Sequence, residues 1–436
     1  MNFLLKNGII VDPAVGKHER KDLIVKDKKV YSAPDGCSSS KYIVIDCSGK
    51  IITPGFIDVH THLRDPGFEY KEDIITGSKS AVAGGVTSIF CMPNTVPVVD
   101  NIETVHYIIE KAKRSAVVNV YPIAAMTMGS EGLEPVAFEQ LLKIGVVSFS
   151  DDGRWVRDSR IMCEIMRFSA QSGVRIIQHC EDIGIANKGV INLGRASKRL
   201  NLPGIPVTAE DVAVYRDIEL CALTGAHVHI AHVSSARSLE LIEQAKHRGI
   251  DITCEVAPHH LVLNDECIKQ DDANYKVNPP LRTKDDSQTL IEGLKNGVVD
   301  MIATDHAPHA EYEKNKGFLT APFGLIGMET AFPVLYTRLV KDGIMSLMDI
   351  VTAMSSNPAR LFGLKNKGSL ADGFDADIAV IDLETSYKID KNKFYSKSKN
   401  SPYHGWNVCG KITDVFVEGN LVYTNGEIAK RKESLL

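Results

Sequence analysis

The sequence has no long apolar run and no Cys-x-x-Cys pair, and these absences exclude several classes of protein. No stretch approaches the length of a membrane span, and the apolar run within residues 1–17 is too short for a signal peptide. The nine cysteines are an odd number, so we expect reduced thiols and a cytoplasmic protein. The net charge is −5 and the basic residues are scattered, so we expect no nucleic-acid partner and no membrane partner.

Internal repeats, low-complexity segments and flexible linkers are also absent, and the apolar content of 44% is close to that of an average globular protein. Residues 1–53 are predicted to form short strands, the first over Phe3–Val11, and they carry no helix signal. Residues 54–364 alternate apolar β runs with amphipathic helical patterns, and residues 365–436 return to strands, with a hairpin across Glu418-Gly419. We therefore predict an α/β protein: a (β/α)8 TIM-type barrel over 54–364, with a small β-sandwich domain built from both chain termini.

Eight apolar β runs in the central part are separated by helical patterns, which is the alternation of a parallel α/β fold. Eight such strands suit a closed barrel with insertions. The alternative is an open, doubly wound sheet, but no Gly-x-Gly-x-x-Gly follows the first run, which weakens this alternative. The runs are Phe56–Val59, Val86–Cys91, Asn119–Ala125, Val146–Phe149, Val174–Gln178, Val228–Ala231, Ile252–Val256 and Met301–Thr304, and the helical patterns include Lys71–Ala83, Asn101–Ala116, Ser159–Ser172, Thr208–Thr224 and Ala236–Arg248.

Two histidines one residue apart, His60 and His62, follow the first of these runs. Alternate side chains of a strand face the same side, so both imidazoles are placed to bind one cation. Arg64 has the same parity and aims its guanidinium into the same space. The alternative is that two strand histidines simply face solvent, and the ends of the other strands help to decide between these readings.

In a (β/α)8 barrel the chemistry lies just past the C-terminal ends of the strands. Histidines and carboxylates follow most of the predicted strands in this sequence. His179 and His232 each end a strand of their own and supply a second metal half-site. Strand parity selects His232 within its run, and it places His227 and His229 toward the helices or the surface.

Two divalent ions held close together need a bridging anion besides hydroxide. Asp151 and Asp152 are the candidates, and parity does not choose between them because the strand has already ended. Asp305 is the best catalytic carboxylate, since it directly follows a strand and can accept a proton and pass it to a leaving nitrogen. The polar segment Ala310–Thr320 contains Gly317 and is expected to form a lid over the site.

A carboxylate-bearing small molecule suits the remaining polar residues. Arg64 donates a bidentate pair to a carboxylate, and Asn94 adds a further donor. Asn278 and His309 are placed to contact the other amide and carboxylate atoms of such a substrate. No role is assigned to His259-His260.

Four motifs together resemble those of one known family. They are His60-Thr61-His62-Leu63-Arg64-Asp65-Pro66-Gly67, Met92-Pro93-Asn94-Thr95, Ser150-Asp151-Asp152-Gly153 and Ala303-Thr304-Asp305-His306-Ala307-Pro308-His309. In these motifs the chain resembles the dihydroorotases, in their class I bacterial form within the amidohydrolase superfamily. The resemblance extends from end to end and includes the β-rich termini and Pro322-Phe323-Gly324.

The resemblance implies reversible cyclisation of N-carbamoyl-L-aspartate to L-dihydroorotate plus water in pyrimidine (UMP) biosynthesis. It implies Zn2+, two ions per subunit or one, with a bridging hydroxide as the nucleophile in the hydrolytic direction and Asp305 as general base and acid. It also favours Asp152 over Asp151 as the bridging ligand. The implied metal ligands are His60, His62, Asp152, His179, His232 and Asp305, and the implied substrate contacts are His62, Arg64, Asn94, Asn278, His309, Phe323 and Gly324.

Hydantoinases, allantoinases and the other class of dihydroorotase bridge their metals with a carbamylated lysine, but residues 144–155 contain no lysine. Arg154-Trp155 is bulkier than the family pattern leads us to expect. Two other hypotheses stay open: another cyclic amidase, or a non-enzymatic barrel that organises a partner such as aspartate transcarbamoylase. The intact ligand set argues against the second. A homodimer and association with aspartate transcarbamoylase also stay open.

Overall fold

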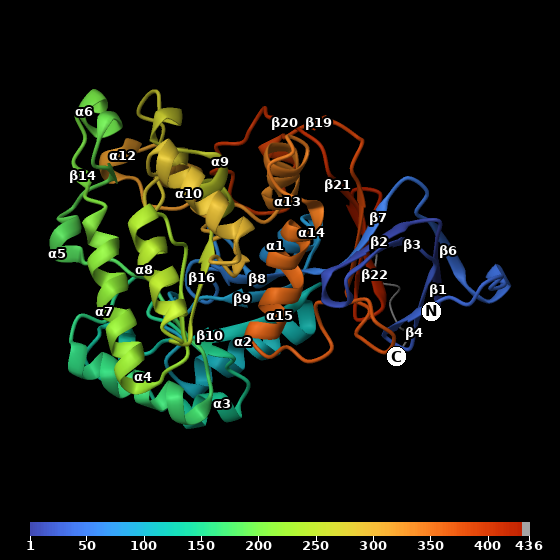
Figure 1. The fold of residues 1–436 in the computed structure, drawn as a ribbon, viewed down its shortest axis with the longest axis horizontal. Helices are drawn as coiled ribbons and strands as arrows, with labels where there is room; N and C mark the ends of the chain where they lie inside the picture. Colours follow the sequence, from blue (N-terminus) through green and yellow to red (C-terminus); the bar gives the residue numbers. More distant parts are fainter. Residues whose placement is uncertain (430–436) are drawn as a thin grey trace.

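A ring of eight parallel strands forms the centre of the computed structural model, which describes residues 1–429 (Figure 1). It consists of two four-stranded arcs, which meet where Ser148 Oγ donates to Arg175 O at 2.7 Å and where the His62 amide donates to His306 O at 2.9 Å. The predicted barrel is therefore confirmed. One arc comprises β8 (Phe56–Thr61), β9 (Val86–Cys91), β10 (Asn119–Ala124) and β11 (Ser148–Phe149), and the other β12 (Ile176–Gln178), β15 (Val228–Ile230), β16 (Ile252–Val256) and β17 (Met301–Ile302).

Amphipathic helices surround this ring, and local capping explains where they begin and end. In α4 (Ser159–Ser172), the side chain of Asp158 accepts hydrogen bonds from the first-turn amides, and Gly173 ends the helix with a left-handed φ of 74°. The apolar face of α4 packs against the barrel core. The other long helices are α1 (Ile74–Ala83), α2 (Ile102–Ser115), α7 (Thr208–Thr224), α8 (Ala236–His247) and α10 (Lys284–Lys295), with the shorter α3 (Phe138–Lys143).

Strand residues alternate between the interior of the barrel and the helix layer. Ile57, Val59 and Ile177 pack with one another inside the ring. Val228 and Ile230 pack with the helices. Both faces of most barrel strands are thus buried, as in other parallel sheets that helices cover, whereas the first three residues of β10 are only partly buried.

The prediction that His229 faces the helices or the surface is wrong. Because Val228 and Ile230 face the helices, His229 points into the barrel, where it is buried and its ring lies edge-on to Phe362 at 5.6 Å. His232 nevertheless reaches the interior, because β15 ends at Ile230 and His232 takes a left-handed φ of 35°. Strand parity therefore cannot be carried past the end of the strand.

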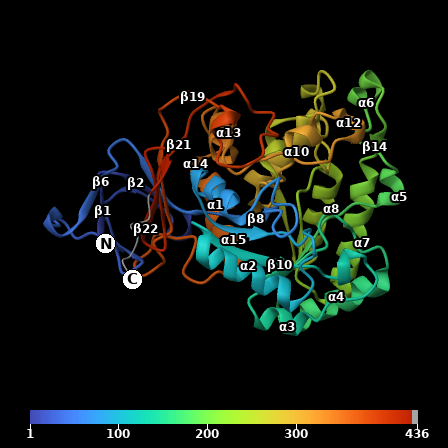
Figure 2. The same cartoon turned by 180° about the vertical axis from the view of Figure 1, so that it is seen from behind.

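Two further sheets form a β-sandwich from the two ends of the chain (Figures 1 and 2). The seven-stranded sheet joins the two chain ends, because β7 pairs with β2 from the N-terminal part and with β18 from the C-terminal part. Phe3 and Phe416 meet edge-on across the sandwich at 5.1 Å. The predicted sandwich is confirmed. The sheets have the orders β5-β4-β1-β6 and β23-β22-β21-β18-β7-β2-β3, with β1 (Phe3–Lys6), β2 (Ile9–Asp12), β3 (Lys17–Arg20), β4 (Leu23–Lys26), β5 (Lys29–Ser32), β6 (Ile43–Asp46), β7 (Ile51–Pro54), β18 (Ile378–Asp382), β21 (Lys411–Val417), β22 (Asn420–Thr424) and β23 (Glu427–Ile428).

The expected first strand, Phe3–Val11, is two strands, because Asn7 takes a φ of 65° and a Cβ at Gly8 would lie 2.6 Å from the Ile52 side chain. The chain crosses between the two sheets at this point. The hairpin across Glu418-Gly419 forms as expected. The domain limits at 53/54 and 364/365 stay a prediction, and residues 430–436 of the last segment lie outside the described residues.

Short elements complete the connections. None of the helices among the described residues combines the length and apolar character needed to span a bilayer. The short elements are α5 (Ile183–Ala186), β13 (Ile191–Asn192), α6 (Arg195–Leu200), β14 (Gly204–Ile205), α9 (Pro258–Val262), α11 (Glu311–Lys314), α12 (Gly317–Thr320), α13 (Ala331–Leu335), α14 (Leu347–Val351), α15 (Asn357–Leu361), β19 (Tyr387–Lys388) and β20 (Asn407–Val408).

Candidate metal centre and active site

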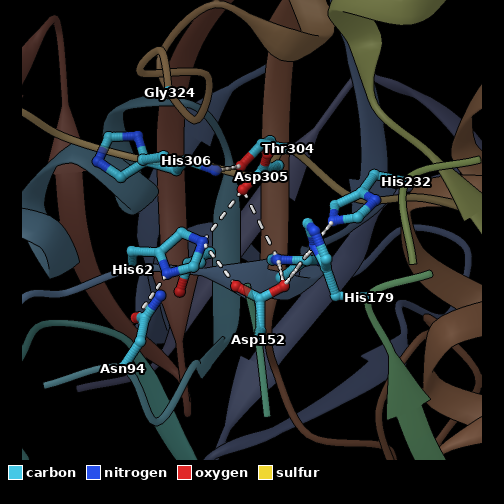
Figure 3. Close-up of polar contacts among 12 residues, drawn as sticks. His62, Asn94, Asp152, His179, His232, Thr304, Asp305, His306 and Gly324 are labelled. Atoms are coloured by element: carbon cyan, nitrogen blue, oxygen red, sulfur yellow. Dashed lines mark hydrogen bonds and ion pairs between the residues drawn. The ribbon is translucent and has the colours of Figure 1, made fainter. Parts of the chain in front are cut away.

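Six histidine and aspartate side chains converge at the C-terminal ends of the barrel strands (Figure 3). All six are buried, although they come from five different strands. Two groups of three have ligand atoms within 4.8 Å of one another: His60, Asp152 and His232 form one group, and His60, His62 and Asp305 form the other. The six residues are His60 in β8, His62 directly after β8, Asp152 after β11, His179 after β12, His232 after β15 and Asp305 after β17.

Asp152 lies in the middle of this cluster and contacts four imidazoles. Its Oδ1 is 3.4 Å from His60 Nε2, 3.4 Å from His179 Nδ1 and 3.8 Å from His232 Nε2. Its Oδ2 is 3.5 Å from His62 Nε2. The carboxylate therefore spans both histidine pairs, which is the geometry that a bridging ligand requires.

The neighbouring Asp151 has a different environment. Its Oδ1 accepts the backbone amides of Met126 and Thr127 at 2.8 and 3.1 Å, and its Oδ2 accepts the Thr127 hydroxyl. Asp151 therefore holds the loop after β10, and only Asp152 of the pair faces the cluster.

Asp305 completes the side of the cluster nearest β8. Its Oδ1 lies 3.1 Å from His62 Nε2 and 3.6 Å from His60 Nε2. His62 donates from Nδ1 to Asn94 Oδ1 at 2.9 Å, because an amide oxygen can only accept, and this leaves the Nε2 lone pair facing the cluster. The side chains of His62, Asn94 and Asp305 lie along one line of contacts in Figure 3.

The donor set fits a divalent metal. His179 Nδ1 and His232 Nε2 lie only 3.0 Å apart. His60 Nε2 and Asp152 Oδ1 are buried with no hydrogen-bond partner among the described residues. Unpartnered buried polar atoms cost free energy, and a cation among them would satisfy their lone pairs. Imidazole nitrogens and carboxylate oxygens are ligands that zinc accepts.

The charges of the cluster also suit a metal. Burial acts to raise the pKa of Asp152, but the charge of His60 and the adjacent imidazoles of His179 and His232 hold that pKa well below its usual value. Burial also acts to raise the pKa of Asp305, but the contact with His62 and the charge of His60 lower that pKa. Burial, followed by the charge of Arg64, lowers the pKa of His62. Anionic carboxylates and a neutral imidazole are the forms that bind metal ions.

Two buried acids that sequence reasoning missed support these residues. Asp58 accepts the amide of Thr304 at 3.0 Å and that of His60 at 3.3 Å, and burial raises its pKa to about 6. Glu255 accepts from His60 Nδ1 at 2.7 Å. In the sequence, the signal for each acid is its place as a single carboxylate within an apolar strand run. A carboxylate buried in a strand needs polar partners, so such a position indicates a role in holding neighbouring residues.

Arg64 and His309 meet beside the cluster. Arg64 Nε donates to Pro308 O at 3.2 Å, and its Nη2 lies 3.3 Å from His309 Nε2. His309 Nε2 donates to Phe323 O at 2.7 Å. Burial, followed by the charges of Arg64 and Lys71, lowers the pKa of His309. A guanidinium next to a neutral imidazole forms a pocket wall that suits a carboxylate.

Asn278 and Gly324 occupy the rim. Asn278 Nδ2 donates to Glu181 Oε2 at 3.0 Å, and its Oδ1 is buried without a hydrogen-bond partner among residues 1–429. Gly324 has a φ of 132°, and a Cβ there would lie 2.6 Å from that of Ala307. The structure thus gives Asn278 a free acceptor and lets the backbone at Gly324 pass close to the site.

The segment Ala310–Thr320 contains α11 and α12 rather than a simple polar loop. Lys314 is buried, and its Nζ donates to Pro322 O at 2.9 Å and to Gly324 O at 2.8 Å. These bonds tie the segment to the rim, and closure over a substrate stays a prediction. Among the unassigned histidines, His260 Nε2 donates to Pro279 O at 3.0 Å.

Comparison with known proteins places this fold and site in a class. The chain belongs to the amidohydrolase family, whose family model matches residues 51–422. Within that family it is similar to dihydroorotases along nearly its whole length. The dihydroorotase of Acetivibrio thermocellus is 47% identical over 420 residues, 96% of this chain and 98% of the relative. That of Caldanaerobacter subterraneus subsp. tengcongensis is 45% identical over 433 residues, 99% of this chain and 100% of the relative.

Solved structures show the same architecture. The L-hydantoinase (dihydropyrimidinase) from Arthrobacter aurescens has a TM-score of 0.88 at 28% identity, covering 98% of this chain and 97% of that protein. The D-hydantoinase (dihydropyrimidinase) from Thermus sp. has a TM-score of 0.86 at 26% identity, covering 99% and 97%. The resemblance that the motifs predicted is therefore confirmed at the level of the family.

Proposed function

We propose that the protein is a zinc-dependent dihydroorotase that interconverts N-carbamoyl-L-aspartate and L-dihydroorotate in de novo pyrimidine biosynthesis. The observation that carries this proposal is the buried cluster around Asp152, with Arg64 and His309 beside it. The cluster suits metal-assisted hydrolysis of an amide, and the guanidinium suits the carboxylate that this substrate carries. The similarity to named dihydroorotases supports the same substrate.

In this proposal the six clustered side chains would hold zinc, two ions per subunit. His60, His62 and Asp305 would be ligands on one side of Asp152, and His179 and His232 on the other. Bound zinc supplies a hydroxide nucleophile at neutral pH and polarises the reacting carbonyl. A single ion per subunit is the alternative, and metal analysis of the purified protein distinguishes the two.

Asp305 carries the proton. In the hydrolytic direction its carboxylate accepts a proton as the attacking oxygen bonds to the ring carbonyl carbon, and it then delivers that proton to the ring nitrogen as the C–N bond breaks. Cyclisation runs the same steps backwards, with Asp305 protonated at the start. Its lowered pKa keeps it ready as a base at neutral pH.

The remaining residues bind and orient the substrate. Arg64, with Asn94 and His309, pairs with the substrate carboxylate, and the unpartnered Oδ1 of Asn278 accepts a ring N–H. The backbone of Phe323-Gly324 and the imidazole of His62 complete the contacts. A cytoplasmic location, a homodimer and association with aspartate transcarbamoylase belong to the proposal on the resemblance alone.

A second candidate function is hydantoin or allantoin hydrolysis, because the similar solved structures include hydantoinases. The zinc-loaded protein should be assayed with L-dihydroorotate, hydantoin and allantoin in parallel. We expect turnover of L-dihydroorotate and of N-carbamoyl-L-aspartate in reverse. Faster turnover of hydantoin or allantoin would contradict the dihydroorotase proposal.

The variant Arg64→Met tests the carboxylate contact in the same assay. Loss of the charge-assisted pair should raise KM for L-dihydroorotate by about 30-fold or more, since bonds to charged groups contribute roughly 2–3 kcal/mol. Turnover of an uncharged hydantoin should change little. An unchanged KM for L-dihydroorotate would show that Arg64 does not bind the carboxylate.

A further inference from the structure

We propose that Glu255 and His229 form an anionic support in the barrel interior that orients His60 as a metal ligand. Both residues are buried, Glu255 in β16 and His229 in β15, and neither belongs to the cluster of six. The inference rests on the proposed function only in treating His60 as a ligand. Glu255 and His229 are positioning residues, because neither side chain is expected to touch metal or substrate.

Glu255 determines which nitrogen of His60 carries the proton. Its Oε1 lies 2.7 Å from His60 Nδ1, and a carboxylate has no proton to donate, so Nδ1 must be the donor. The other ring nitrogen, Nε2, then faces Asp152 Oδ1 at 3.4 Å and Asp305 Oδ1 at 3.6 Å. Glu255 thus selects the tautomer and ring orientation that a metal ligand needs.

His229 holds the second oxygen of the same carboxylate. Its Nε2 donates to Glu255 Oε2 at 3.1 Å, and its Nδ1 lies 2.9 Å from Thr253 Oγ1. Thr253 Oγ1 in turn accepts from Arg175 Nη1 at 3.3 Å, and it also lies 3.4 Å from Val228 O, to which its hydroxyl can donate. Both carboxylate oxygens of Glu255 are therefore held by a histidine, Oε1 by His60 and Oε2 by His229.

The chain of bonds runs through the barrel from its N-terminal end to the cluster. Arg175 precedes β12, Thr253 and His229 lie within their strands, and Glu255 sits next to the end of β16. The carboxylate receives hydrogen bonds on both oxygens, so its rotamer is fixed. A fixed negative charge behind Nδ1 also raises the basicity of Nε2 and should strengthen the metal bond.

Zinc affinity, measured by competition with a chromophoric chelator on the folded full-length protein, tests the support directly. Glu255→Gln keeps an acceptor for His60 but removes the charge, and it should weaken zinc binding by about 10- to 100-fold. His229→Leu should weaken it as well, because Glu255 Oε2 loses its donor, whereas His229→Gln retains a donor and should recover most of the affinity.

Matched controls come from two residues outside but next to the barrel strands, Asp300 before β17 and His227 before β15. Asp300→Asn alters a carboxylate that accepts the amide of Cys254, next to Glu255, at 2.8 Å. His227→Gln alters a histidine two residues before His229 that contacts Asp251. Both should bind zinc within about threefold of the wild type, since neither reaches His60.

Wild-type zinc affinity in Glu255→Gln would overturn the proposal. If that variant does not fold, equal affinities of His229→Leu and His229→Gln would overturn it instead. The proposed function is tested separately. If the wild-type protein binds zinc but does not turn over L-dihydroorotate, the proposed function is wrong, and the order of zinc affinities among the variants still tests the support.

Discussion

Arg64, His232 and Asp305 share an uncommon backbone conformation, with φ values of 60°, 35° and 47°. Such left-handed conformations cost non-glycine residues about 1–3 kcal/mol each, so the surrounding structure must hold them. At Asp305 the holding group is Asp58, which accepts both the amide and the hydroxyl of Thr304. The barrel therefore directs these three side chains toward the site through strained backbone conformations.

The variant Asp305→Asn tests the proton transfer assigned to this residue. An amide cannot accept the proton, so turnover of L-dihydroorotate should fall by about 100-fold or more. The pKa of Asp305 is lowered, so acidification below neutral pH should not reduce the wild-type rate through this group until the usual carboxyl range has been passed. Zinc content of the variant must be measured alongside, and near-wild-type turnover with zinc retained would disprove the assignment.

Local spacing was enough to find some site residues but not others. His60 and His62 were predicted from their spacing at the end of one strand, although the pairing of β8 with β9 shifts between Asp58 and Thr61. Asp152 and Asp151 could not be separated by parity, since both follow the end of β11. Glu255 and His229 were missed because their roles depend on each other across neighbouring strands. The structure brings the predicted ligands together, and their metal binding stays a prediction.

At the scale of elements, helix boundaries were the most predictable feature. The predicted helices Ser159–Ser172 and Thr208–Thr224 agree with α4 and α7 to the residue, because Gly173 and Gly225 end them with left-handed φ values. The expected strand Phe3–Val11 is wrong, because the chain bends at Asn7-Gly8 and crosses from one sheet of the sandwich to the other. Nothing within the strand pattern itself required that break.

Glu329 links helix α1 to the chain that leads into the C-terminal strands. Its Oε1 accepts from the Ser80 hydroxyl at 2.9 Å and the Ser396 amide at 3.1 Å, and its Oε2 accepts the Tyr395 amide at 3.1 Å. Burial raises its pKa to about 7 from the ordinary value of 4.5. The folded state therefore binds more protons than the unfolded state between these pH values, and stability falls as the pH rises through this window.

The free energy of unfolding of metal-free wild type and Glu329→Gln should be compared at pH 5 and pH 8 by denaturant titration. The variant has no charge to bury, so relative to it the wild type should lose up to about 3 kcal/mol between the two pH values. A difference between the two proteins that is the same at both pH values would show that Glu329 is not protonated on folding.

At the scale of the whole molecule, the candidate ligands join the two arcs of the barrel. His60, His62 and Asp152 come from the arc β8–β11, whereas His179, His232 and Asp305 come from the arc β12–β17. The two arcs are separate in the strand pairing, and few backbone bonds connect them. A metal held between them would act as a cross-link.

Removal of metal by a chelator should therefore lower the melting temperature, and zinc should restore it. Binding to the folded state alone adds about 2.7 kcal/mol when free zinc is 100 times its dissociation constant. The loss of protection, followed by hydrogen exchange, should be largest at the seam of β11 and β12 and small in the sandwich around Phe416. Equal melting temperatures with and without zinc would contradict the cross-link.

The sequence by itself determined the alternation of strands and helices, the division into barrel and paired termini, and the motifs at the strand ends, because periodicity, capping and turn chemistry act over a few neighbouring residues. Only the tertiary structure decided that Asp152 faces the cluster and Asp151 does not, and that His229 and Glu255 lie behind His60. Those outcomes depend on how strands distant in sequence close into a ring and on backbone turns past the strand ends, where alternation no longer predicts which way a side chain points.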